Sequence, residues 1–410
     1  MIKKLSSWQE IMESDRVIST AFLDNWNEEK SRQQSKKKEE APDPDEERWG
    51  LYDERGNMVT SFIAGPTRLS YDGQIIDCGE GHMIGSLPEA RSHGNVRKLL
   101  HYVMEEFRSR GYVFCEFVPF SFSFYRQFGF ELVARNMSQK FSIDQLKDFK
   151  CTMQVKQVLS QRDTDIARKL YETFILDRNF AYLRQDKDWT YRGSGEFGER
   201  DWFNKDKQVY TYLFYDDGGK ARGYLSYFFE PGPEGPFTGT MKVTDMVYDS
   251  PETFRNILGF CYGLRAKMLD VELVLMDDLD LALVLPECSE KIQRKVEGHI
   301  TGRVLNVEKA LSLMKQPQGS GSYSVMVTDA FMTENTGSYQ VSYQDGKAVS
   351  VEKSDDTTKT ADLEVDETTL VQLLVGRADL EEAEYRTGTK VNANRKTLEK
   401  AFVHKTICIR

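Results

Sequence analysis

The most informative segment of the sequence is Ile84-Gly85-Ser86-Leu87-Pro88-Glu89-Ala90-Arg91-Ser92-His93-Gly94-Asn95-Val96-Arg97. It joins an extended segment, which ends at a proline, to a stretch with apolar residues at helical spacing: Val96, Leu99, Leu100, Val103, Met104 and Phe107. Residues 112–118 then read as a buried strand, so the order predicts a β-α-β unit. Unpaired N–H groups at the start of the helix suit a pyrophosphate, and Gly94 allows close approach. Taken alone, this pattern is equally typical of a simple helix cap.

Length and composition set the frame around this stretch. The chain has 410 residues, 40% hydrophobic and 29% charged, with a formal net charge of −10, which suggests about two to three domains. The acidic balance argues against a dedicated nucleic-acid binder and agrees with a cationic small-molecule partner. Six cysteines form no CxxC pair, and no stretch is long and apolar enough for a membrane helix. We therefore expect a reduced, cytoplasmic protein that contacts neither nucleic acid nor membrane.

Three segments with mixed secondary structure follow one another along the chain. In the first, the charge run at residues 28–48 predicts a solvated helix end and a flexible loop inside a domain, and Asp72-Gly73 predicts a hairpin turn. The second repeats the order of the first, with a helix expected from Pro251 to about residue 268, but has Tyr248-Asp249-Ser250 in place of a glycine-rich loop. The third, from about residue 301, has short alternating strands and helices typical of an α+β domain.

Two motifs in the first segment resemble those of the GNAT N-acetyltransferases. Residues 91–96 are similar to motif A, R/Q-x-x-G-x-G/A, although Val96 stands at its last position. Residues 124–131, FYRQFGFE, resemble the F-Y-x-x-x-G-F-x segment that closes a GNAT domain. The two motifs stand in the expected order, with a helix and a strand of suitable length between them.

The wider pattern resembles the enhanced intracellular survival (Eis) family of these acetyltransferases. The resemblance implies tandem GNAT-like mixed β-sheet domains, α/β in class, followed by a sterol-carrier-like α+β domain. It predicts a catalytic GNAT domain at residues 1–148, a second GNAT-like domain without a cofactor loop at 149–298, and the sterol-carrier-like domain at 299–410. It also implies a homo-oligomer, a hexamer in the family.

Site residues are carried over from the family motif by motif. The resemblance places acetyl-CoA contacts on Ile84, Gly85, Ser86, Arg91, Ser92, His93, Gly94, Asn95, Val96, Arg97, Phe120 and Ser121. It makes Tyr125 the general acid, although a tyrosine in so aromatic a run is usually a core residue. It makes the C-terminal carboxylate, here that of Arg410, the general base. His93 is a weaker candidate base, because in this loop it more naturally lends its backbone N–H.

These residues predict N-acetyl transfer from acetyl-CoA to a primary amine of a cationic small molecule, aminoglycoside- or polyamine-like, by direct attack. Neither HExxH nor GxSxG occurs, so the sequence supports neither a metal hydrolase nor a serine hydrolase, and no metal is expected. The alternative is a non-catalytic protein that binds CoA or a lipid through the sterol-carrier-like domain. Thiol release from acetyl-CoA in the presence of amines distinguishes the two.

Overall fold

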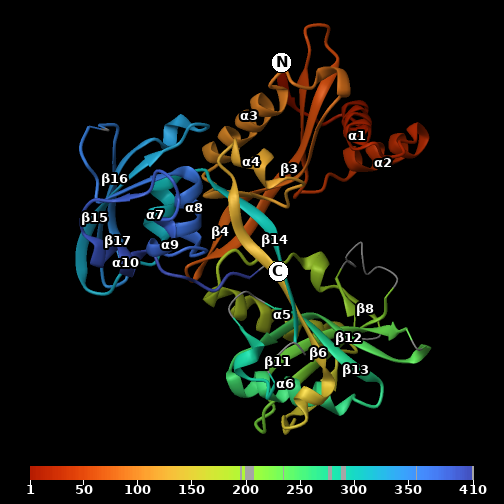
Figure 1. Ribbon diagram of the computed structural model, residues 1–410. Coiled ribbons are helices and arrows are strands. Elements are labelled where there is room, and N and C mark those ends of the chain that lie inside the picture. Colours follow the sequence, from red (N-terminus) through yellow and green to blue (C-terminus); the bar gives the residue numbers. More distant parts are fainter. Residues whose placement is uncertain are drawn as a thin grey trace. The chain divides into compact units, whose positions relative to one another are not determined.

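The computed structural model describes residues 1–193, 196–198, 207–233, 235–275, 279–287, 292–356 and 358–408. It divides into two compact units (Figure 1). The first unit contains Met1–Ala134 and His299–Lys405, and the second contains Arg135–Gly298 and Thr406–Arg410. The first unit thus combines the N-terminal segment with most of the C-terminal segment.

The N-terminal part of the first unit is built on a mixed β-sheet. Its strands, in spatial order, are β1 (Ile2–Lys4), β2 (Glu47–Tyr52), β3 (Met58–Tyr71), β4 (Gln74–Ser86), β5 (Phe114–Phe117) and β14 (Gln293–Val304). β4 and β5 run parallel, and the other neighbours are antiparallel. Asp72 and Gly73, with φ of 47° and 90°, make the predicted turn between β3 and β4. The strand β6 (Glu131–Ser142) begins in this unit.

Helices cover both faces of this sheet. They are α1 (Trp8–Phe22), α2 (Glu28–Glu40), α3 (Asn95–Ser109) and α4 (Phe122–Arg126). Figure 1 shows α1 and α2 on one side of β3 and β4, and α3 on the other. The apolar stripe of α3 is fully buried at Leu99, Leu100, Val103, Met104 and Phe107, which confirms the predicted amphipathic helix.

The charge run was predicted to be a solvated helix end and a flexible loop, but its residues Glu28–Glu40 form a helix of their own. Asn27 caps it by accepting a hydrogen bond from the N–H of Lys30, and Arg32 pairs with Glu28 one turn away. The small residue Ser31 is buried and donates to Asp15 of α1. Capping and contact with α1 therefore outweigh the lack of apolar residues.

The C-terminal part of the first unit is an α+β fold. Its five-stranded sheet has the order β17 (Lys347–Ser354), β16 (Gly337–Gln344), β15 (Ser320–Thr328), β18 (Leu363–Asp366) and β19 (Lys390–Val391). Its helices are α7 (Val307–Leu313), η6 (Thr333–Asn335), α8 (Glu367–Val375), α9 (Leu380–Ala383) and α10 (Arg395–Ala401). Leu305, Phe331 and Met332 belong to the same buried cluster as the core face of α3, so the two parts share one core.

The second unit has a sheet of similar design. Its strands, in order, are β6, β13 (Met268–Leu275), β12 (Gly235–Tyr248), β11 (Ala221–Gly232), β10 (Val209–Tyr215) and β7 (Gln154–Gln157). The remaining elements are η2 (Ile143–Leu146), α5 (Gln161–Phe174), η3 (Ile175–Asp177), η4 (Asp186–Trp189), β8 (Tyr191–Gly193), β9 (Glu196–Phe197), α6 (Pro251–Gly263) and η5 (Leu281–Leu283). The helix expected to reach about residue 268 ends at Gly263, a residue with low helix propensity, and Met268 begins β13.

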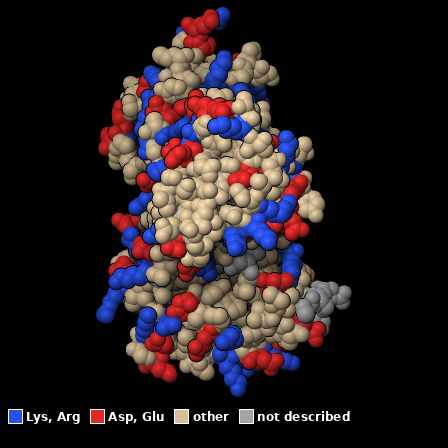
Figure 2. Space-filling view, turned by 90° about the vertical axis from the view of Figure 1, so that its left-hand side faces the viewer, with Lys and Arg blue, Asp and Glu red and all other residues tan. Residues whose placement is uncertain are grey.

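Two surface properties bear on the expected partners. Within the described residues, no helix has the length and apolar character needed to cross a membrane. Figure 2 shows Lys and Arg side chains interspersed with Asp and Glu over the face in view, rather than gathered into one broad basic surface.

Candidate active site

The site begins where two parallel strands separate. β4 pairs with β5 only over three positions, Gly79–Gly81 with Cys115–Phe117, and then continues along β3 as far as Ser86. Gly81 must be small here, because a Cβ atom on it would lie 1.9 Å from the Phe117 ring. Beyond Gly81, no strand that the structure describes pairs with the β5 side of β4. This leaves an open strand edge at Ile84, Gly85 and Ser86, the residues predicted to meet pantetheine.

The predicted phosphate loop connects this edge to α3. It contains the turn η1 (Pro88–Ala90), and both Ser92 and Gly94 have left-handed backbones, with φ of 65° and 71°. The first bond within the helix runs from the N–H of Lys98 to the carbonyl of Gly94. The N–H groups of Asn95, Val96 and Arg97 therefore lack a helical partner and lie at the positive end of the helix dipole.

Side chains of the loop are partly held by the protein itself. Arg91 donates to the carbonyl of Ala21 at 3.0 Å, and the Asn95 side chain donates to the carbonyl of Ala90 at 3.0 Å. Arg97 lies over the rings of Phe128 and Phe331. The side chain of His93 is exposed in the loop. The loop thus offers backbone donors first and cationic side chains second.

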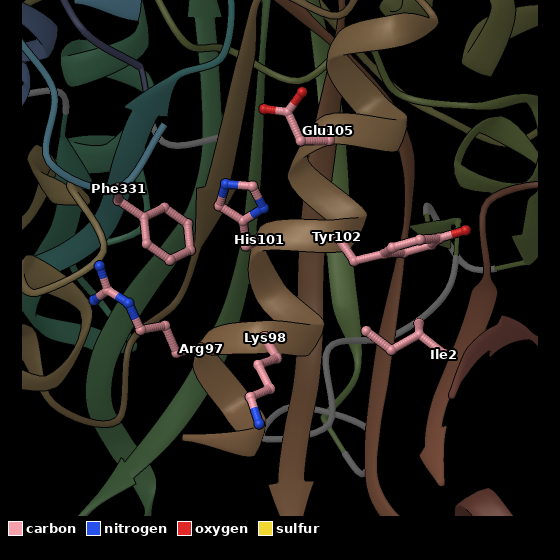
Figure 3. A pocket seen from close by; sticks show the side chains of 7 residues that line it. All are labelled: Ile2, Arg97, Lys98, His101, Tyr102, Glu105 and Phe331. Carbon is pink, nitrogen blue, oxygen red and sulfur yellow. The ribbon is translucent and has the colours of Figure 1, made fainter. Parts of the chain in front are cut away.

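Arg97 also lines a cavity on the outer side of α3, of about 420 Å³. Figure 3 shows its lining: Ile2, Arg97, Lys98, His101, Tyr102, Glu105 and Phe331. Arg97 and Lys98 belong to the first turn of α3, so positive charge gathers where the helix dipole is also positive.

Tyr125 lies on α4, which follows β5. Ser121 caps this helix by accepting a hydrogen bond from the N–H of Phe124, and Phe120 beside it is 67% exposed. Tyr125 itself is 4% exposed and stacks on Phe117 with ring centroids 4.9 Å apart. Burial raises its pKa to about 12, so the phenol keeps its proton at neutral pH. Its hydroxyl has no hydrogen-bond partner among the residues that the structure describes.

The segment that carries Tyr125 is held from the C-terminal part of the first unit by Arg386. The buried Glu131 carboxylate accepts hydrogen bonds from Arg126 at 2.8 Å, from the Leu132 N–H at 2.8 Å and from Arg386 at 3.0 Å. Burial alone would raise the pKa of Glu131, but these donors outweigh it and the net pKa is lowered. Gln372 donates to the carbonyl of Leu132 at 2.9 Å.

A second buried group holds the same segment. Arg303 of β14, fully buried, donates to the carbonyl of Phe128 and to the carboxylate of Asp329. Gly129 has φ of 77°, and any Cβ on it would collide with the Arg303 guanidinium. Sequence reasoning missed both groups, because their members lie up to 255 residues apart in the chain.

Glu116 on β5 entered the sequence reasoning only as a fallback base, in case the terminal carboxylate does not serve. Glu116 is 1% exposed, and neither of its carboxylate oxygens has a hydrogen-bond partner among the described residues. The signal was present in the sequence as one charged residue within the otherwise apolar strand 113–118.

The second unit and the chain end differ from this arrangement. Between β12 and α6, Ser250 caps the helix through the Thr253 N–H and Thr253 donates to Asp249, so local side chains already serve the helix start. Asn179 pairs with the Thr406–Cys408 segment. Arg410, predicted to supply the base, lies outside the described residues.

Two groups of described side chains could each bring metal ligands within 4.8 Å of one another. They are His101, Glu105 and Glu334, and Asp379, Glu382 and His404. The expectation of no metal therefore stays a prediction.

Comparisons with known proteins identify the domain families along the chain. Residues 4–133 and 181–304 each match an acetyltransferase (GNAT) domain model, and residues 307–408 match the sterol carrier protein domain. No curated protein matches the sequence.

Solved structures are similar over nearly the whole chain. A probable N-acyltransferase from Enterococcus faecalis has 18% identity and a TM-score of 0.78, covering 99% of this chain and 98% of its own. A GCN5-related N-acetyltransferase from Anabaena variabilis has 16% identity and a TM-score of 0.76, covering 98% and 97%. Eis1 from Mycobacterium abscessus has 16% identity and a TM-score of 0.74, covering 99% and 98%.

These findings confirm the predicted fold class and the resemblance on which it rested. The chain carries two acetyltransferase (GNAT) domains followed by a sterol carrier protein domain. These domains are typical of an acyl-CoA-dependent N-acetyltransferase, and the fold of the chain resembles that of the Eis-like GNAT acetyltransferases.

Proposed function

We propose that the protein transfers the acetyl group of acetyl-CoA directly to a primary amine of a cationic small molecule, aminoglycoside- or polyamine-like. The observation that carries this proposal is Tyr125, a buried phenol that keeps its proton and has no described hydrogen-bond partner, stacked on the last paired residue of β5. The resemblance to Eis-like enzymes and the net charge of −10 support the cationic acceptor.

Acetyl-CoA would bind along the open edge and the loop. Its pyrophosphate would accept hydrogen bonds from the N–H groups at the start of α3, with Ser92, His93 and Gly94 forming the loop around it. Arg91 and Arg97 add positive charge. The pantetheine arm would pair with Ile84–Ser86, and Phe120 and Ser121 would flank it from the β5 side.

The chemistry needs an electrophile, an acid and a base. The N–H at Ile84 would polarise the thioester carbonyl, the amine nitrogen would form the new C–N bond, and the C–S bond would break. Tyr125 would donate its proton to the departing thiolate. The terminal carboxylate of Arg410 would take the proton that the nitrogen loses as the amide forms.

The test is Tyr125→Phe, which removes only the hydroxyl. Thiol release with a panel of amines should fall about 10²–10⁴-fold, the usual contribution of a general acid, while calorimetry should show acetyl-CoA affinity within a few-fold. Tyr112→Phe, a half-buried tyrosine after the C-terminal end of α3, is the matched control and should be silent. Unchanged kcat in a folded Tyr125→Phe variant would make Tyr125 a core residue only.

A further inference from the structure

Glu116 is a fully buried carboxyl group that forms no hydrogen bond with any part of the chain that the structure describes. The large majority of buried polar side chains have a partner, and an unpaired one carries a desolvation penalty. Here the penalty falls on the strand that borders the candidate active site.

The strand register places Glu116 beside a second carboxyl group. Glu116 pairs with Glu80 of β4 on one side and with Gly302 of β14, which has no side chain, on the other. The next pair, Gly81 with Phe117, is the last before β4 and β5 separate. The two carboxyl groups therefore lie side by side, one residue before the opening.

Alternation along β5 determines the face of the sheet. Cys115 and Phe117 pack in the core with α3, and Tyr125 stacks on Phe117. Because side chains alternate along a strand, Glu116 and its neighbour Glu80 lie on the opposite face. The proton donor to the thiolate and this acidic pair are thus on different sides of the place where the thioester would lie.

The groups around Glu116 make it a stronger base than an ordinary glutamate. Burial first, and then the charge of Glu80, raise the pKa of Glu116 well above its usual range. The thiols of Cys78 and Cys115 stay neutral, because burial raises the pKa of each. Glu80 is partly exposed, and its Oε1 lies 3.6 Å from Nδ1 of the exposed His82. These residues form a path from Glu116 to the surface.

We propose that Glu116, reached by way of Glu80, takes the proton that a cationic acceptor must lose before it can attack. This inference rests on the proposed function. An ammonium group has no lone pair, so one N–H bond must break first, and a new O–H bond forms on the carboxylate pair. The neutral amine then attacks, the Arg410 carboxylate takes the second proton, and the first leaves through Glu80 and His82 to solvent. A general base works best when its pKa lies near the operating pH. The pKa of an ordinary glutamate, about 4.3, lies too far below neutral pH for this.

The experiment compares two acceptors of similar size, a strongly basic primary amine and one whose pKa lies below 7. Thiol release gives kcat/KM for wild type, Glu116→Gln, Glu80→Gln and the control Cys115→Ala, which changes the other face of β5. In Glu116→Gln, kcat/KM for the basic amine at pH 7 should fall on the order of 10²-fold. The loss cannot exceed about 2,500-fold. An amine of pKa about 10.4 has about one neutral molecule in 2,500 at pH 7, and that neutral fraction can still react without the base.

Two features separate this effect from a structural one. The weakly basic amine needs no deprotonation, so its kcat/KM should stay within about threefold, and the loss for the basic amine should disappear as the pH approaches the amine's pKa. Glu80→Gln removes the charge that raises the pKa of Glu116, so it should move the acid limb of the wild-type profile to lower pH. Equal losses for both amines, or no loss in Glu116→Gln, would overturn the inference.

A measurement without turnover separates this inference from the proposed function. As the pH is lowered, infrared spectroscopy should show the C=O stretch of a protonated carboxylic acid appearing at higher pH than for an ordinary glutamate, a band that Glu116→Gln removes and Cys115→Ala retains. Glutamine has nearly the shape of the protonated acid, so the variant should fold, as thermal unfolding would verify. Absence of this band in the wild type overturns the inference alone, whereas a wild type that releases no thiol with any amine overturns the proposed function.

Discussion

Replacing Asp329 with alanine should destabilise the first unit by about 3–5 kcal/mol, the usual loss when one member of a buried ion pair is removed. The side chains of Arg303 and Asp329 are 0% and 1% exposed. Asp329 also accepts hydrogen bonds from the N–H groups of Phe331 at 3.0 Å and Met332 at 2.8 Å. The variant therefore leaves one buried cation and two N–H donors without their acceptor, which places the cost in the upper part of that range.

Urea unfolding followed by tryptophan fluorescence measures this loss. In a Trp189→Phe/Trp202→Phe background, the remaining tryptophans, Trp8, Trp26 and Trp49, all lie in the first unit, so the signal reports that unit alone. The double variant Arg303→Met/Asp329→Leu should recover part of the stability, because it removes the unpaired buried charge but still leaves the N–H groups of Phe331 and Met332 without their acceptor. A loss below about 1 kcal/mol in Asp329→Ala, or a double variant less stable than the single one, would refute the reasoning.

Three further predictions address the loop before α3, the end of the chain and the Glu131 carboxylate that holds the segment carrying Tyr125. Gly94→Asp should abolish acetyl-CoA binding in calorimetry, since it strains a left-handed backbone and adds negative charge at the helix start, whereas wild type should bind one equivalent per chain. Adding a few residues after Arg410 should lower kcat sharply while Arg410→Ala, which keeps the carboxylate, stays mild; full activity of a C-terminally tagged protein would contradict this. Glu131→Gln should be least stable relative to wild type above about pH 4.3, where the Glu131 carboxylate is charged in both the folded and the unfolded protein. The difference in the free energy of unfolding should vanish as the pH falls through the lowered pKa of folded Glu131. A difference in urea unfolding that does not depend on pH would exclude this linkage.

The sequence was most informative where the determining signals are local. The turn at Asp72-Gly73, the apolar stripe of α3 and the glycine before it each act within a few residues, and all three were predicted. The helix Glu28–Glu40 was missed because its stability comes from a cap, ion pairs and contact with α1 rather than from apolar periodicity.

Features that join distant segments could not be predicted in this way. Arg386 donates a hydrogen bond to Glu131, although the two residues are 255 positions apart in the sequence. No local pattern around either residue predicts that they meet. The adjacency of Glu80 and Glu116 depends on strand register, which a shift of one residue would abolish. The roles assigned to Tyr125 and the CoA-contacting residues came from resemblance, and they stay predictions until the variants above are measured.

The shared core of the first unit has a consequence for how a ribosome must make this protein. Leu305, Phe331 and Met332 complete the cluster beneath α3, yet they are synthesised only after the whole of residues 135–298. At about 5–20 residues per second, the N-terminal segment waits on the order of 10–30 s with part of its apolar surface uncovered. During that interval the nascent chain is a natural client for chaperones, and a fragment that stops near residue 134 should aggregate rather than fold.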